Sequence, residues 1–124
     1  MAAHTDLWGE ITPNAVRTPV SILREQASLL GAKTTYMVEG KVETHVSGTR
    51  FYHSFNLVVP ALDNYSYQLF QISHEVGLYP VHVEYQSSYI ELKSEEAFVN
   101  WLGEKLSSAE TKSLIGNLLA QANS

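Results

Sequence analysis

Histidine is the residue type in this sequence with the widest scope for acid–base or metal chemistry, because the chain has five histidines and no cysteine. His82 and Glu84 are two residues apart in a predicted strand, so both side chains point from one face and can meet a ligand together. His53 alternates with Phe51 and Phe55, which places it on the core side of its strand. A metal site needs several converging ligands and this pattern supplies two at most, so we expect no metal.

For His53, the sequence allows a group in a ligand pocket or a buried histidine held by a hydrogen bond to a backbone carbonyl or a tyrosine. Tyrosine offers the same two interpretations, since its amphipathic ring binds ligands and partner proteins but also stabilises sheets through cross-strand pairs. All of the tyrosines fall in the central part of the chain: Tyr36, Tyr52, Tyr65, Tyr67, Tyr79, Tyr85 and Tyr89.

The motifs of several large enzyme classes are missing from the sequence. The seven glycines are scattered and form no phosphate-binding loop, and neither Gly-x-Ser-x-Gly nor His-Glu-x-x-His occurs. These absences favour a protein that is not an enzyme and that uses no cofactor.

The elements that position these residues begin with a helix predicted over residues 19–30. Thr18 is the expected N-cap, Pro19 suits the first helical position, and Gly31 is expected to end the helix. One apolar stripe contains Val20, Leu23, Ala27 and Leu30, and Ile22 and Leu29 widen it to nearly half of the circumference. Such a broad apolar face indicates a helix that lies flat against a sheet.

A two-residue alternation of apolar and polar side chains replaces the helical period after Lys33. It predicts strands over residues 36–46, 50–59, 65–73 and 80–86, with a short fifth strand over 89–92. Pro80 cannot donate to a sheet ladder, so the fourth strand is expected at an edge.

Helical periodicity returns at Ser94, the expected N-cap of a helix that carries Phe98, Trp101 and Leu102 on one face. Residues 107–110 form an expected capping box before a last helix. Gly103 and Gly116 lie inside these helices and indicate either a close helix–helix approach or tolerated exposed positions. The fold class is therefore α+β, an antiparallel sheet of four to five strands in the order α-β-β-β-β-α-α, in one domain over residues 1–124 with a mobile N-terminal tail over 1–13.

The turn between the first two strands predicts their register. If Gly48 and Thr49 are its central pair, the apolar residues of both strands lie on one side of the sheet. The resulting neighbours are Val46 and Phe51, Thr44 and His53, Phe55 and Leu69, and Leu57 and Tyr67. The opposite, polar side then collects Tyr52, Ser54, Asn56, Ser66, Gln68, His82 and Glu84. We expect this side to be either a recognition surface or a merely solvated sheet face.

Charge and length exclude several classes of partner. The chain has 124 residues, 44% of them hydrophobic, and carries 13 acidic and 8 basic residues for a net charge of -5. Nucleic acid and anionic membrane surfaces both require a basic protein, so neither is an expected partner. The N-terminus carries no secretory signal pattern, and no apolar run approaches a membrane span, so the expected location is cytoplasmic.

Three stretches, over residues 17–34, 59–70 and 78–81, resemble a group of small uncharacterised bacterial proteins. The resemblance implies a bacterial origin and a stand-alone domain, and it assigns no functional residue.

These observations favour a non-catalytic protein-binding domain of the immunity-protein, antitoxin or secretion-chaperone type. The predicted partner is a protein, including a second copy in a homodimer, because the last strand and the glycine-containing helices leave uncovered surfaces. The alternative is a small-molecule-binding protein or enzyme with a pocket between helix 19–30 and the sheet, lined by His53, Tyr67 and Tyr85.

Overall fold

The fold of the computed structural model is an α+β arrangement of one five-stranded antiparallel sheet and three helices, as the sequence predicts. The structure describes residues 5–85 and 88–124. The sheet is a meander in which each strand pairs with the next, in the order β1-β2-β3-β4-β5. The elements in chain order are α1 (Pro19–Lys33), β1 (Glu39–Ser47), β2 (Arg50–Val59), the short 3₁₀ helix η1 (Pro60–Leu62), β3 (Tyr65–His74), β4 (Val81–Tyr85), β5 (Ser88–Leu92), α2 (Glu95–Leu106) and α3 (Ala109–Ala122).

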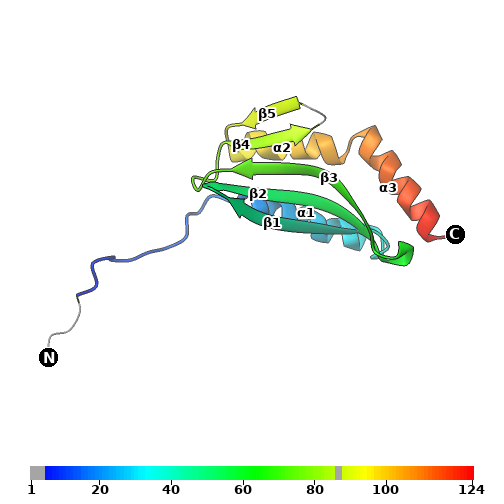
Figure 1. The fold of residues 1–124 in the computed structure, drawn as a ribbon, viewed down its shortest axis with the longest axis horizontal. Coiled ribbons are helices and arrows are strands. Elements are labelled where there is room, and N and C mark those ends of the chain that lie inside the picture. Colours follow the sequence, from blue (N-terminus) through cyan, green and yellow to red (C-terminus); the bar gives the residue numbers. More distant parts are fainter. Residues whose placement is uncertain (1–4, 86–87) are drawn as a thin grey trace.

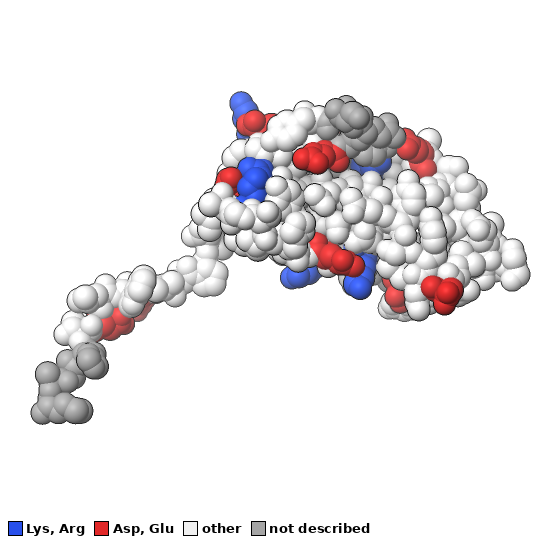
Figure 2. Space-filling model, viewed as in Figure 1, with Lys and Arg blue, Asp and Glu red and all other residues white. Residues whose placement is uncertain are grey.

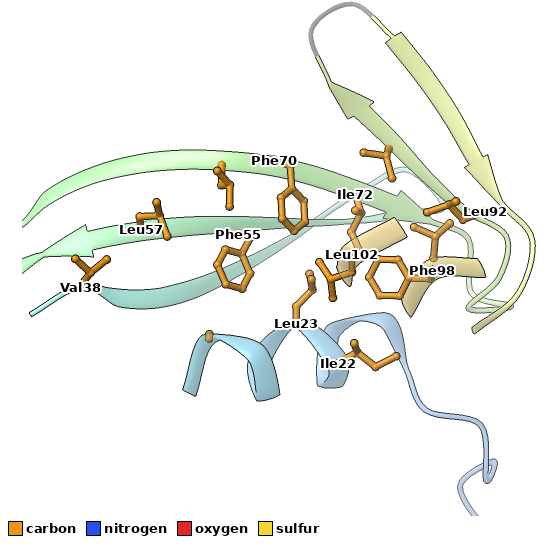
Figure 3. Close-up of a cluster of buried hydrophobic side chains, with 14 of the residues drawn as sticks. Ile22, Leu23, Val38, Phe55, Leu57, Phe70, Ile72, Leu92, Phe98 and Leu102 are labelled. Atoms are coloured by element: carbon orange, nitrogen blue, oxygen red, sulfur yellow. The ribbon is translucent and has the colours of Figure 1, made fainter. Parts of the chain in front are cut away.

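The helices share one side of the sheet and leave the other side uncovered (Figure 1). The core lies between the sheet and these helices (Figure 3). The rings of Phe55 and Phe70 stack across neighbouring strands, with their centroids 5.5 Å apart. The Trp101 ring of α2 contacts Phe70 edge-on, with a centroid distance of 5.2 Å. This aromatic contact ties α2 to the centre of the sheet.

Helix α1 begins as predicted but ends later. Thr18 caps it, since its hydroxyl accepts a hydrogen bond from the Ser21 N–H at 3.2 Å. The expectation that Gly31 ends the helix is wrong, because the helix continues to Lys33. Gly31 is buried, and the Tyr36 ring lies 3.3 Å from the place where a Cβ would be, so glycine there makes room for that ring.

The buried side of α1 faces the sheet through Leu23 and Ala27, both on the predicted stripe. Leu29, which widens that stripe in the sequence, is instead 47% exposed. The helix approaches β1 most closely at Gly40, where an added Cβ would lie 2.6 Å from the Cα of Ala27. A glycine is therefore required at this contact.

The register of the first two strands confirms the prediction from the turn. Gly48 has a φ of +61°, and Thr44 lies opposite His53. In the next pair Leu57 lies opposite Tyr67, also as predicted. The expected contact of Phe55 with Leu69 is wrong by one residue, because a bulge after Phe55 sets it opposite Phe70.

The fourth strand is not an edge strand. β4 pairs with β3 on one side and with β5 on the other, so β1 and β5 form the two edges. Pro80 precedes β4 and leaves its ladder intact. No described helix is both long and apolar enough to cross a membrane.

The C-terminal helices begin at serine caps. The Ser94 hydroxyl accepts from the Ala97 N–H at 3.1 Å, as predicted. The last helix is capped by Ser108 instead of Ser107, because the Ser108 hydroxyl accepts from the Thr111 N–H at 3.2 Å. A Cβ at Gly103 or at Gly116 would meet nothing within 4 Å, so neither glycine makes a close contact within the described chain.

Candidate functional site

The uncovered side of the sheet carries the predicted polar residues. Two rows of neighbouring side chains cross all five strands on this side. The first row is His45, Tyr52, Ser73, His82 and Glu91, and the second is Glu43, Ser54, Gln71, Glu84 and Tyr89. Figure 2, which looks onto this side, shows a mostly uncharged surface on which several acidic and basic groups lie next to one another. The structure therefore places His82 and Glu84 on the predicted face with Tyr52 and Ser54.

Arg50 organises one end of this polar face. Its guanidinium donates to the Ser73 hydroxyl at 3.0 Å and to Nδ1 of His82 at 2.5 Å, and it pairs with Glu75 at 3.1 Å. The Nε2 of His82 lies 3.7 Å from Glu91. Because Nδ1 of His82 accepts from a guanidinium, the proton of the neutral ring belongs on Nε2, toward Glu91. Nδ1 of His82 is thus engaged by Arg50, while Nε2 faces Glu91 at a distance too long for a hydrogen bond.

Asn56 also has a structural task. It is only 7% exposed, and its amide donates to the Lys41 carbonyl at 3.3 Å and to the Ser54 hydroxyl at 3.1 Å. The bond to Lys41 joins β2 to β1 next to the bulge, and the bond to Ser54 lies within β2. Asn56 therefore stabilises the sheet, whatever else the polar face does.

Gln68 and Glu84 lie together at the end of the sheet where β3 runs past β4. With Tyr67 they line a cavity of about 250 Å³ that also touches Lys105 and Glu110. The structure therefore brings Gln68 and Glu84, which were expected on the recognition surface, together with Tyr67, which was expected in the pocket.

The two buried histidines form a pair on the helix side of the sheet. His53 is 3% exposed and His74 is 5% exposed, and their Nε2 atoms are 2.9 Å apart. The Nδ1 of His53 lies 2.8 Å from the Thr44 hydroxyl, and the Nδ1 of His74 lies 2.6 Å from the Glu75 carbonyl. The predicted strand over residues 65–73 ends just before His74, whereas β3 includes it. The register of β2 and β3 then makes His53 and His74 diagonal neighbours on one face.

One arrangement of protons satisfies every atom of this pair. A carbonyl only accepts, so Nδ1 of His74 carries a proton, and when the ring is neutral Nε2 of His74 is an acceptor. His53 then donates from Nε2 to His74 and accepts from the Thr44 hydroxyl at Nδ1. Both rings are neutral in this arrangement. His53 is a buried histidine held by hydrogen bonds, but its partners are Thr44 and His74 instead of the expected backbone carbonyl or tyrosine.

Acid should weaken the fold through this pair. Burial lowers the pKa of His53 to about 4, and the positive charges of His74, once it is protonated, and of Arg24 lower it further. The unfolded chain binds this proton near pH 6.5, and the folded chain does not. The contribution of His53 to stability is therefore fully present above pH 6.5, and it is lost as the pH falls toward 4. The expected loss between pH 7.5 and 4.5 is about 2–3 kcal/mol, measured by urea denaturation.

The control for this pH dependence is His53→Gln, which removes the titrating ring but keeps an amide that donates toward His74. We expect this variant to lose most of the extra pH dependence between 7.5 and 4.5. If the free energy of unfolding depends on pH equally in the wild type and in His53→Gln, His53 is not neutral and buried.

A larger, apolar groove lies on the helix side, between α1 and the pair α2–α3. Its volume is about 530 Å³, and it opens to solvent. Phe55, Leu57 and Leu69 of the sheet lie at its base. The helices supply Ile22, Gln26, Leu29 and Leu30 on one side and Val99, Leu102, Gly103, Leu106 and Ile115 on the other. Leu29 is 47% exposed and Val99 is 39% exposed, so the groove presents apolar surface to water.

The groove lies where the pocket alternative places a site, but other residues line it. Of the described groove residues, none is a histidine or a tyrosine. His53 is enclosed in its pair with His74, Tyr67 lines the smaller cavity, and the Tyr85 side chain lies outside the described part of the structure. The signal for the groove in the sequence is the apolar stripe of α1, which is wider than the sheet alone requires.

The chain has no significant match among family models, curated proteins or solved structures. No cluster of three or more histidine, aspartate or glutamate side chains suited to a metal ion occurs among the described residues.

Proposed function

We propose that this protein is a non-catalytic protein-binding domain that receives an apolar segment of a partner in the groove between α1 and α2–α3. The observation that carries the proposal is the groove itself, an open apolar depression of about 530 Å³ with two exposed aliphatic side chains at Leu29 and Val99. Exposed apolar surface of this kind marks interaction sites in folded proteins. A helix or strand with apolar side chains on one face is the occupant that such grooves take.

Polar groups at the groove support binding over catalysis. Among the described lining residues, the carboxylate of Glu25 is paired with Arg17 at 2.7 Å. Thr111 is buried, and its hydroxyl donates to the Lys105 carbonyl at 2.8 Å, where it joins α2 to α3. These groups are used by the fold. Among the immunity-like, antitoxin-like and chaperone-like classes, an apolar groove favours the chaperone-like class, which holds segments of client chains.

The second candidate is a protein that binds a small apolar molecule in the same groove. Its volume falls within the roughly 300–1,000 Å³ typical of ligand pockets. The two candidates differ in the occupant and not in the site.

A side chain at residue 103 provides the test. Gly103 lines the groove, and a Cβ there would meet no atom within 4 Å, so Gly103→Phe fills the groove without a clash at its first atom. Gly116→Phe is the matched control, because Gly116 is equally open and does not line the groove. Both changes replace a helical glycine, which favours the helix.

Phage-displayed random peptides are selected on the wild-type protein and measured on both variants. We expect selected peptides to carry several apolar residues and to bind Gly103→Phe at least tenfold more weakly, a loss of about 1.4 kcal/mol, while binding Gly116→Phe normally. If no peptide is enriched but anilinonaphthalene sulfonate binds the wild type and not Gly103→Phe, the small-molecule candidate replaces the proposal. Peptides that tolerate Gly103→Phe but not His82→Ala would move the site to the polar sheet face.

A further inference from the structure

The N-terminal residues 5–16, here called the arm, carry large apolar side chains that the rest of the chain does not cover. Leu7 is 89% exposed, Trp8 is 82% exposed and Ile11 is 72% exposed. The arm contains no helix or strand and extends away from the body (Figure 1). Apolar side chains held in water in this way indicate a segment that is covered by a partner.

The arm and the groove have complementary chemistry. Leu7 and Ile11 are four residues apart, a spacing that puts both side chains on one face in a helix and in a strand alike. The charges of the arm are the acidic residues Asp6 and Glu10, as Figure 2 shows. Among the charged residues that line the groove, Arg17 and Glu25 are paired with each other, and the other two, Lys33 and Lys112, are basic. An apolar, acidic segment therefore fits an apolar groove with a basic rim.

The point where the arm leaves the body is held by two hydrogen bonds. The Arg17 N–H donates to the Glu95 carboxylate at 3.1 Å, and the Arg17 carbonyl accepts from the Tyr79 hydroxyl at 3.0 Å. Thr18 then begins α1 as its N-cap. The chain is thus anchored beside its own groove, which Arg17 lines. From there the arm extends away from the body (Figure 1).

We propose that the arm of a second copy occupies the groove, so that two copies exchange arms in a symmetric dimer. The twelve residues of the arm span at most about 40 Å when extended, which is enough to cross to a neighbouring molecule. Exchange of identical segments between two protomers closes a twofold assembly and leaves neither arm exposed. The inference rests on the proposed function in that it names one occupant of the same groove.

The test uses the two tryptophans of the chain. In a Trp101→Phe background, Trp8 is the only tryptophan and reports whether the arm is in water. Sedimentation and Trp8 emission are recorded together from about 1 to 100 μM. We expect the 13.8 kDa species to give way to one of twice that mass, with Trp8 emission moving to shorter wavelength over the same concentration range.

Variants of both partners identify the contact. Gly103→Phe in the groove and the double change Leu7→Ser with Ile11→Ser in the arm should each weaken the dimer at least tenfold, and Gly116→Phe should leave it unchanged. Three results would each overturn the inference: a monomer with exposed Trp8 throughout, a blue-shifted Trp8 in a monomer, or a dimer that survives both groove and arm variants.

The peptide selection separates this inference from the proposed function. If the groove takes selected peptides but not the arm, only the arm exchange fails. If it takes neither peptides nor the arm, the protein-binding role of the groove fails as well.

Discussion

Replacing Gly40 with alanine is expected to lower the free energy of unfolding by about 3 kcal/mol, because the added methyl group overlaps the backbone of α1. An ideal Cβ at residue 40 lies 2.6 Å from the Cα and 2.7 Å from the Cβ of Ala27. Backbone atoms of a packed helix cannot move singly, so α1 has to lift away from β1. Urea denaturation followed by circular dichroism measures the loss.

Two further substitutions sharpen the Gly40 experiment. Gly103→Ala adds a methyl group in open space and should stabilise the protein by up to about 1 kcal/mol. Ala27→Gly should not rescue Gly40→Ala, because the Cα of Ala27 still lies 2.6 Å away. If Gly40→Ala is within about 0.5 kcal/mol of the wild type, the close approach of α1 to β1 is wrong.

Leu23→Ala is expected to lower the free energy of unfolding by about 2–5 kcal/mol, because it removes a fully enclosed side chain and leaves a cavity. Leu23 is 0% exposed and faces the sheet from α1 among the residues of Figure 3. Thermal and chemical denaturation both measure this change.

Leu29→Ala on the same helix is the matched control for Leu23→Ala. Leu29 is 47% exposed at the rim of the groove, so its truncation should change stability by less than about 0.5 kcal/mol. A loss of equal size at both positions would mean that the buried face of α1 has been misplaced.

The histidines show why residue type alone is a weak guide to a site. His53 and His82 are the residues in this chain best suited to chemistry, yet the structure engages both in hydrogen bonds within the fold. No buried side-chain nitrogen or oxygen among the described residues lacks a hydrogen-bond partner. The groove, in contrast, is built mostly from aliphatic residues, whose side chains have no groups for acid–base or metal chemistry.

Local signals predicted the elements and much of their pairing. The Thr18 and Ser94 caps, the turn at Gly48 and the two-residue alternation depend on neighbours a few residues away, so they can be read from the chain itself. The alternation also put Tyr52, Ser54, His82 and Glu84 on one side of the sheet, as the pairing confirms.

Three local signals in the sequence did not predict the structure correctly. Glycine often ends helices, but α1 continues past Gly31 to Lys33, and the Tyr36 ring packs against the open side of Gly31. Pro80 is typical of an edge strand, but it precedes β4, which leaves the strand free to pair on both sides. The bulge after Phe55 shifts the pairing of β2 with β3 by one residue, and no turn signal marks it.

The sequence by itself determined the α+β class, the order of the elements and the polar side of the sheet, because helical and strand periods and caps act over a few residues. Only the tertiary structure decided the contact of Gly40 with α1, the His53–His74 pair and the groove between α1 and α2–α3. Each of these joins segments far apart in the chain, and its geometry depends on how the helices sit on the sheet. A groove in particular is space left between packed elements, and no residue pattern within one element defines it.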